Sequence, residues 1–189
     1  LAEKDKIPVL FTAGGTASGK STTVGAALEE AHIVFDSTFS NYERSKERLQ
    51  RALDSGRRVE VHYVYRDPLE AWDAAKERAK KEAAGRTVST QAHTFTHTGA
   101  ASTVARLAKE FASTPNVQFQ YFENSTANGI KPGTIALTSK GDYTNLGDRL
   151  KEYDAQRSSS EDATEAPPGD SRDVESRGTK PAPKSEDRS

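Results

Sequence analysis

The chain has 189 residues, of which 33% are hydrophobic and 29% charged, so no stretch is apolar enough for a membrane span of about 20 residues. Its 27 basic and 28 acidic residues give a net charge of −1, which provides no global positive field for binding duplex nucleic acid. The absence of cysteine excludes disulfides, a thiolate nucleophile and cysteine-bound zinc.

The two ends of the sequence lead to further expectations. Four of the first six residues are charged and the apolar run after them is short, so no signal peptide is recognised and we expect a cytoplasmic location. A chain without methionine that begins at Leu1 is expected to be a piece of a longer polypeptide. Residues 155–189 contain four prolines, 14 charges and one branched aliphatic residue, a composition typical of disorder. We therefore predict one domain over residues 1–154 and a disordered tail or linker over residues 155–189.

Within the predicted domain, buried strands alternate with helices. Short continuous apolar runs predict strands, and apolar residues at helical spacing predict helices. The predicted strands are residues 7–13, 32–35, 59–65 and 117–122, and the predicted helices are residues 20–30, 42–54, 68–85 and 100–112. This alternation predicts an α/β fold with a mainly parallel sheet in the order 2-1-3-4 and helices on both faces.

Local signals mark several boundaries. Gly56 is expected to cap the carboxyl end of the second helix. Asp67, Pro68 and Glu70 combine an N-cap, a proline at the first helical position and a capping-box carboxylate. After the fourth strand we predict a turn over residues 129–133, a short strand over residues 134–137 and a last helix over residues 146–153.

A phosphate-binding motif follows the first predicted strand. The segment matches G-x-x-x-x-G-K-[ST] in full, and the predicted nucleotide-binding residues are Gly14, Gly15, Thr16, Ala17, Ser18, Gly19, Lys20, Ser21 and Thr22. Glycines let the backbone N–H groups turn toward phosphate, Lys20 supplies a positive charge, and the Ser21 hydroxyl can join a Mg²⁺ shell. A chance glycine-rich turn is the alternative, and the strand before and helix after the motif favour the phosphate loop. The motif predicts binding of ATP or GTP with Mg²⁺.

Asp36 ends the second predicted strand, 16 residues after Lys20. Strand carboxyl ends meet at the nucleotide site of such folds, so Asp36 is expected beside the loop as a Mg²⁺ ligand or as the base for an attacking hydroxyl. Its alternative role is to cap the strand end in Asp36-Ser37-Thr38.

Basic residues follow in two groups. Arg78 and Arg86 lie near the end of the third predicted helix, where a lid could carry charge to a transferring phosphoryl group; a solvated helix face is the equal alternative. Arg44, Arg48 and Arg51 alternate with glutamates at helical spacing and are predicted to be surface residues.

The Thr/His-rich segment over residues 86–99 is predicted to be a mobile loop that closes over the site. His93 and His97 are four residues apart within it, but no third ligand stands nearby, so zinc is disfavoured and a substrate-facing histidine is favoured. In this interpretation Arg86 reaches the γ-phosphate and His93 the acceptor.

Several blocks together resemble the zeta toxin family of P-loop kinases. They are residues 14–22, residues 33–38, the strand over residues 59–65, residues 67–71 with Arg78, the Gly-Arg pair at residues 85–86 and the Asn-Ser end of the last core strand. The resemblance implies a three-layer P-loop kinase fold and phosphoryl transfer from ATP or GTP to a hydroxyl of a small nucleotide-type acceptor, for example a UDP-amino sugar such as UDP-N-acetylglucosamine. It also implies an antitoxin partner, and catalytic roles for Lys20, Asp36, Arg78 and Arg86.

One departure separates the chain from the family pattern. An Asp-x-Asp-x-x-Arg-like segment is expected between the phosphate-loop helix and the Asp-x-Thr strand end, but here Glu30 runs directly into the second strand. The base is then Asp36 or a residue that the sequence does not identify. Two alternatives follow: a nucleotide-binding or NTPase module of a larger mobile-element or phage protein without kinase activity, and a polynucleotide kinase. The neutral charge balance and the lack of an aromatic and basic track disfavour the latter.

Overall fold

The computed structural model describes residues 8–23, 25, 33–81 and 87–164, with the side chains of residues 160–164 excepted. Five strands form one sheet in the order β2-β1-β3-β4-β5. The strands are β1 (Val9–Ala13), β2 (Ile33–Asp36), β3 (Val59–Tyr65), β4 (Val117–Ser125) and β5 (Gly129–Pro132). The first four are parallel, and β5 pairs antiparallel with β4. The predicted parallel sheet and its 2-1-3-4 order are confirmed.

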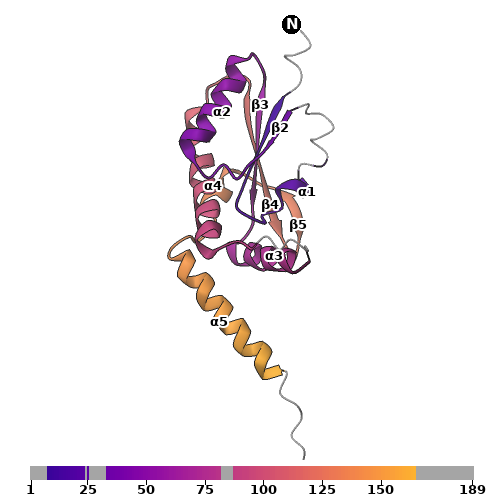
Figure 1. Ribbon diagram of the computed structural model, residues 1–189. Helices are drawn as coiled ribbons and strands as arrows, with labels where there is room; N and C mark the ends of the chain where they lie inside the picture. Colours follow the sequence, from indigo (N-terminus) through magenta and orange to yellow (C-terminus); the bar gives the residue numbers. More distant parts are fainter. Residues whose placement is uncertain (1–7, 24, 26–32, 82–86, 165–189) are drawn as a thin grey trace, which may run out of the picture.

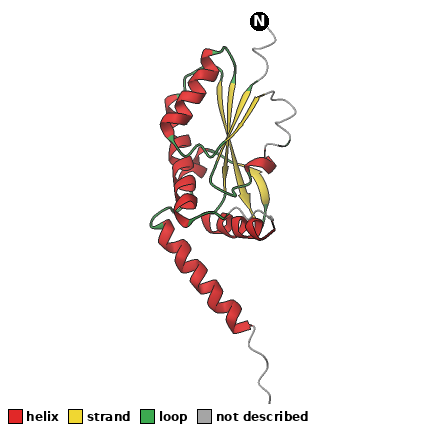
Figure 2. Cartoon of the chain, viewed as in Figure 1, coloured by secondary structure: helices red, strands yellow, loops and turns green. Residues whose placement is uncertain are grey.

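Helices cover both sides of this sheet. They are α1 (Lys20–Thr23), α2 (Tyr42–Asp54), α3 (Pro68–Lys81), α4 (Thr90–Glu110) and α5 (Leu146–Thr164), with a 3-10 helix over Ile135–Ser139. In Figure 1, α2 and α4 lie along one face and α1 along the other, α3 crosses below the sheet, and α5 projects from the body. Figure 2 shows the strands between these helices. The arrangement is the three-layer α/β fold expected of a P-loop kinase.

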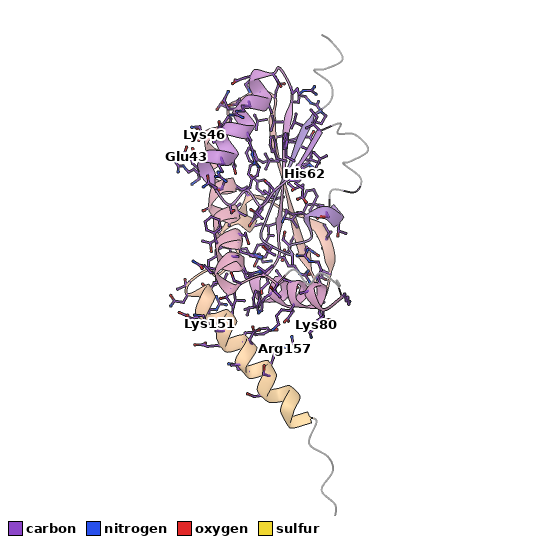
Figure 3. The ribbon with its side chains drawn as sticks, in the orientation of Figure 1. Glu43, Lys46, His62, Lys80, Lys151 and Arg157 are labelled. Carbon is purple, nitrogen blue, oxygen red and sulfur yellow. The ribbon has the colours of Figure 1, made fainter. Side chains whose placement is uncertain are left out.

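The core follows from the burial pattern of the strands. All five residues of β1 are buried, as expected for a strand covered on both faces. Leu49 of α2, Val61 of β3 and Val104 of α4 are fully buried in the same cluster. Arg44, Arg48 and Arg51 are exposed, as predicted. Figure 3 shows Glu43, Lys46 and Lys80 on helix surfaces, whereas His62 lies in the sheet.

The predicted caps lie where the sequence indicated. Gly56 has φ 76° and donates its N–H to the Leu53 carbonyl, closing α2. Asp67 accepts from the amides of Leu69 and Glu70 at the start of α3. The capping-box half of the prediction is wrong, because the Glu70 carboxylate turns to Thr126 and accepts from its amide and hydroxyl at 2.9 and 3.0 Å.

Three predictions for the region after β4 need correction. The predicted turn at residues 129–133 is strand β5, whose Ile130 pairs with Asn124 across a hairpin. The predicted strand at residues 134–137 belongs to the 3-10 helix, which Thr134 caps by accepting from the Ala136 amide. The last helix does not end at residue 153 but continues to Thr164, beyond the predicted domain boundary at residue 154. The rest of the predicted tail, residues 165–189, lies outside the described residues.

The largest correction concerns residues 90–99. They are predicted as a mobile loop but form the first half of α4, which begins at the N-cap Ser89. The buried positions 93, 97, 100, 104 and 107 follow one helical line, so the two histidines occupy places that an apolar side chain would normally mark. The predicted lid and substrate-facing histidine are therefore wrong for this stretch. No described helix combines the length and apolar character needed to cross a membrane.

Candidate nucleotide-binding site

The phosphate loop connects β1 to α1 through backbone conformations that require its glycines. Gly14 has φ 144° and Gly19 has φ 95°, both values that residues with a Cβ atom rarely adopt. A Cβ on Gly14 would lie 2.5 Å from the Val64 carbonyl oxygen, and one on Gly19 would lie 2.3 Å from Nδ2 of Asn124. The glycines are therefore needed both for the turn and for close packing against β3 and β4.

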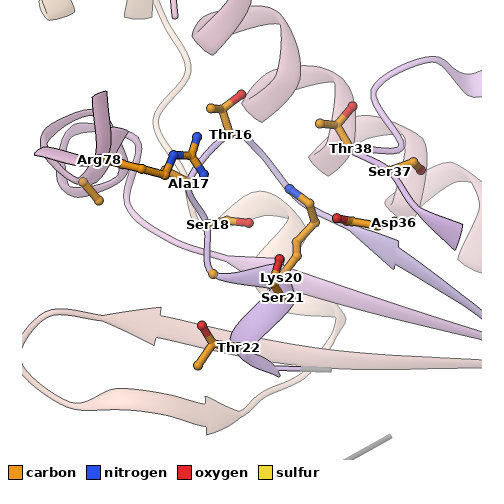
Figure 4. Close-up of a pocket in the computed structure, with 12 residues that line it drawn as sticks. Thr16, Ala17, Ser18, Lys20, Ser21, Thr22, Asp36, Ser37, Thr38 and Arg78 are labelled. Carbon is orange, nitrogen blue, oxygen red and sulfur yellow. The ribbon is translucent and has the colours of Figure 1, made fainter. Parts of the chain in front are cut away.

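Lys20 bends back over this loop. Its ammonium donates to the carbonyls of Gly14 and Gly15 at 3.1 and 3.0 Å. Burial lowers the pKa of Lys20; the Asp36 carboxylate opposes this shift, and Arg78 reinforces it. In Figure 4 the Lys20 side chain rises between Ser18 and Asp36. The loop thus holds an amine that interacts electrostatically with one carboxylate and one guanidinium.

A cavity of about 470 Å³ opens above the loop. Its lining residues are Thr16, Ala17, Ser18, Gly19, Lys20, Ser21, Thr22, Asp36, Ser37, Thr38, Ala74 and Arg78. The cavity therefore brings together nine residues singled out from the sequence, namely seven from residues 16–22 with Asp36 and Arg78, whereas Gly14 and Gly15 are not among its lining residues. Arg86 lies outside the described residues.

Asp36 owes its place to the parallel pairing of β1 and β2. Thr12 of β1 is the register partner of Asp36, and its hydroxyl donates to Asp36 Oδ1 at 2.8 Å. The same Thr12 oxygen accepts from the Ser37 amide at 3.1 Å. Because Thr12 is buried, this contact fixes both the carboxylate and the turn that follows β2.

Two residues that were given no site role from the sequence hold the other side of the loop. Asn124, at the end of β4, donates to the Ser18 carbonyl at 2.8 Å. Arg66, just after β3, donates to the Ala17 carbonyl at 3.3 Å and to Thr126 Oγ1 at 3.1 Å. Both stand at the carboxyl end of a parallel strand, where the site is expected, and Asn124 is also part of the Asn-Ser strand end that resembles the family.

The two histidines lie behind the loop and not in the cavity. His93 and His97 are buried, with ring centroids 4.3 Å apart. His93 contacts the Pro68 carbonyl through Nε2 at 2.9 Å, and His97 contacts the Thr16 carbonyl through Nε2 at 3.0 Å. Burial lowers the pKa of both rings, that of His97 to about 3, so both are neutral at pH 7.

The donors beside the loop fit a hard cation such as Mg²⁺. Ser21 and Asp36 line the same cavity and offer a hydroxyl and a carboxylate oxygen, the ligand types that Mg²⁺ prefers when phosphate oxygens and water complete its shell. No cluster of three or more His, Cys, Asp or Glu with metal-binding geometry exists among the described side chains, the two α4 histidines included. The donor set therefore suits a cation shared with phosphate oxygens better than one held by protein alone.

Comparison with solved structures shows the same fold in other proteins. The AvrRxo1-ORF1:AvrRxo1-ORF2 complex with sulphate ions matches with a TM-score of 0.57 and 14% identity, over 67% of this chain and 57% of that chain. The AvrRxo1-ORF1:-ORF2 complex with ATP matches with a TM-score of 0.57 and 13% identity, over 69% and 58%. This chain thus spans less than two thirds of those solved chains. No curated protein matches the sequence.

The family comparison covers more than half of the chain. The zeta toxin model matches residues 25–130, which begin after the phosphate loop and α1 and run through β2, α2, β3, α3, α4 and β4 into β5. These elements carry Asp36, Arg78 and Asn124, and they pack directly on the loop. The chain belongs to the zeta toxin family.

Proposed function

We propose that the chain is a P-loop kinase that transfers the γ-phosphoryl group of ATP or GTP to a hydroxyl of a small nucleotide-type acceptor, such as a UDP-amino sugar. The observation that carries the proposal is that Lys20, Asp36 and Arg78 line the same cavity above the loop. Family membership and the fold shared with a protein solved with ATP support it. The site does not distinguish ATP from GTP, because its named residues are expected to bind the phosphates, which the two nucleotides share.

The residues have separable tasks in this proposal. Lys20 leaves the Gly14 and Gly15 carbonyls and binds the β- and γ-phosphates, and Arg78 neutralises charge on the transferring group. Ser21 and Asp36 would hold Mg²⁺, which when bound neutralises charge on the phosphate oxygens. Asp36 is also the candidate base: as the acceptor oxygen bonds to the γ-phosphorus and the bond to the β–γ bridging oxygen breaks, the hydroxyl proton passes to its carboxylate. Arg86 remains a predicted lid arginine.

The test is a transfer assay with labelled ATP or GTP and Mg²⁺. UDP-amino sugars, nucleosides, oligonucleotide 5′ ends and water serve as separate acceptors. We expect labelled product with a small nucleotide-type acceptor and a loss of roughly 100-fold or more in Lys20→Ala, because the phosphates lose their principal point charge. Lys80→Ala is the matched control, since this exposed lysine of α3 pairs with Glu77 at 3.2 Å, away from the cavity. Product only on oligonucleotide ends would instead identify a polynucleotide kinase.

One observation favours a second candidate, a nucleotide-binding module without kinase activity. Asp36 is the single carboxylate among the described residues that line the cavity, so it would have to serve both as metal ligand and as base. Nucleotide binding without any phosphorylated acceptor in the screen would favour this module over the kinase.

The proposal extends to a protein partner. The matched solved structures are two-protein complexes, which supports an antitoxin-like inhibitor for this chain as well. Expression of the chain alone should then slow host growth, and Lys20→Ala should restore it. Equal growth inhibition by the wild type and Lys20→Ala would contradict a toxicity that depends on phosphoryl transfer.

A further inference from the structure

Helix α4 holds the N–H of Thr16 at the tip of the phosphate loop. Thr96 Oγ1 lies 3.2 Å from the Thr16 amide nitrogen and 3.0 Å from Thr16 Oγ1, and it donates to the His93 carbonyl at 3.0 Å. A hydroxyl has one hydrogen to donate and two lone pairs to accept. The Thr96 hydrogen is used on His93, so Thr96 accepts from both the amide and the hydroxyl of Thr16, and all its capacity is satisfied.

The next residue of α4 holds the carbonyl of the same residue. His97 Nε2 lies 3.0 Å from the Thr16 oxygen, and because a carbonyl only accepts, the hydrogen belongs to Nε2. The His97 ring also fills the space beside Gly15, where an added Cβ would lie 2.2 Å from Cδ2. Thr96 and His97 thus hold both polar backbone groups of Thr16 and leave no room for the loop to move toward α4.

This contact has a rigid support behind it. The His97 ring packs against His93, whose ring contacts Trp72 at a centroid distance of 5.1 Å and whose Nε2 contacts the Pro68 carbonyl. Pro68 and Trp72 belong to the first turns of α3, the helix that carries Arg78. The neutral rings therefore connect the loop to the helix on the other side of the cavity without placing a buried charge between them.

We propose that Thr96 and His97 are positioning residues that fix the Thr16 peptide and so keep the phosphate loop in its nucleotide-binding conformation before the nucleotide arrives. The inference rests on the proposed function, because it concerns the nucleotide site of that kinase. A loop that is already ordered loses less conformational freedom on binding, so the contribution appears in nucleotide affinity. Neither residue lines the cavity, and neither takes part in the transfer itself.

A solely structural role would affect stability alone, so the test measures the loop and the ligand separately. The probe is a non-hydrolysable ATP analogue with Mg²⁺, titrated by calorimetry into the wild type, Thr96→Val, Thr96→Ser and Thr94→Val. Thr96→Val keeps the shape but removes the acceptor for the Thr16 amide, whereas Thr96→Ser restores it. Thr94 is the matched control on the same helix, because its buried hydroxyl has no hydrogen-bond partner in the part of the chain that the structure describes.

We expect Thr96→Val to weaken binding of the analogue about tenfold, equivalent to about 1.4 kcal/mol. In the transfer assay kcat should change less than KM. Thr96→Ser and Thr94→Val should stay within about twofold of the wild type. Without nucleotide, amide exchange over residues 14–19 should be faster in Thr96→Val than in the wild type, and it should be unchanged in Thr96→Ser and Thr94→Val. His97→Leu and His97→Gln repeat the test on the carbonyl side, since only glutamine keeps an N–H donor.

The outcomes separate the two proposals. A folded Thr96→Val variant with wild-type affinity and wild-type loop exchange would overturn the positioning role and leave the kinase proposal standing. Equal losses in Thr96→Val and Thr94→Val would overturn it too, because they would reflect a general weakening of α4. Absence of analogue binding by the wild-type chain would overturn the proposed function and this inference with it.

Discussion

Thr12 fixes the Asp36 carboxylate from within β1. The contact is 2.8 Å long, and Thr12 is buried, so its hydroxyl holds the carboxylate from a fixed position. Thr12→Val should remove this hold while preserving the shape of the strand. We expect the transfer rate to fall roughly tenfold with nucleotide affinity within about twofold, because a small misplacement of a reacting group lowers rate more than binding. Single-turnover rates and equilibrium titration measure the two effects.

Thr12→Ser is the control for this prediction, since it keeps the hydroxyl and should retain most of the activity. An unchanged transfer rate in Thr12→Val would show that Asp36 does not need this contact, or that Asp36 does not act in the transfer.

His97 should make the stability of the fold sensitive to acid. Burial lowers its pKa to about 3, the nearby His93 and Lys20 act in the same direction, and the Thr16 hydrogen bond opposes them. The unfolded chain takes up a proton near pH 6.5, whereas the folded chain does not until about pH 3. The contribution of His97 is therefore complete above pH 6.5, and it decreases by up to about 1.4 kcal/mol per pH unit as the pH falls from 6.5 toward 3.

Urea unfolding of the wild type and His97→Gln between pH 7 and pH 4.5 measures this contribution. The free energy of unfolding of the wild type should fall more steeply with decreasing pH than that of His97→Gln. The difference in slope should correspond to the uptake of close to one proton on unfolding. The burial of His93 shifts its pKa in the same direction, so the variant should keep part of the slope. Parallel curves for the two proteins would mean that His97 is accessible to protons in the folded state.

At the scale of elements, α4 approaches the segment after β2 closely because Gly99 has no side chain. A Cβ on Gly99 would lie 2.4 Å from the carbonyl oxygen of Ser40 and 3.0 Å from the Cα of Ser40. These backbone atoms cannot move aside as the tip of a flexible side chain can. Gly99→Ala should lower the free energy of unfolding by about 1–3 kcal/mol, although alanine favours the helix. Chemical denaturation measures the change.

Gly147→Ala is the matched control in α5. Its added Cβ would meet Thr94 Oγ1 at 3.7 Å, an ordinary contact, so the same substitution should leave the free energy of unfolding unchanged or raise it by up to about 1 kcal/mol. Equal effects in the two glycine variants would show that the approach of α4 to Ser40 is not tight in solution.

The accuracy of the sequence predictions depended on whether local and tertiary signals agreed. The bounds predicted for α2 and β3 are those observed, because amphipathic spacing, the Gly56 cap and a continuous apolar run all indicated the same limits. The first half of α4 was missed because threonine and histidine are weak helix formers and count as polar. Only contacts distant in sequence, with Thr16 and Pro68, turn that face into a buried one.

The candidate site shows the same division. A motif and a strand end predicted Lys20, Ser21 and Asp36, and the structure brings them to one cavity. The loop contacts of Arg66, Asn124 and Thr96 were not predicted, although Asn124 was noted as part of the strand end that resembles the family. Each acts on a loop carbonyl or amide through its place in the sheet or on α4. Such contacts need the strand order and the helix phase, which a sequence pattern indicates only in outline.

At the scale of the whole molecule, α5 is attached to the body through one end of the helix. Leu146 and Leu150 are buried against Trp72, and Asp154 accepts from Trp72 Nε1 at 2.9 Å and pairs with Lys76 at 2.5 Å. Farther along the helix, Arg157 pairs with Asp73 at 2.8 Å. Because Trp72 also contacts His93, this attachment supports the side of α4 that holds the phosphate loop.

Leu150, which has an exposed fraction of 0%, provides a test of this connection. Leu150→Ala should lower the free energy of unfolding by about 2–5 kcal/mol, because it leaves a cavity beside Trp72. Lys151→Ala, one residue along the same helix and exposed, should change it by less than about 0.5 kcal/mol. Native-state amide exchange should then rise first at the starts of α3 and α4, where Trp72 and His93 lie, and remain unchanged in α2 on the opposite part of the fold. A uniform rise in exchange across α2, α3 and α4 would show that α5 supports the whole core equally and has no particular connection to the loop.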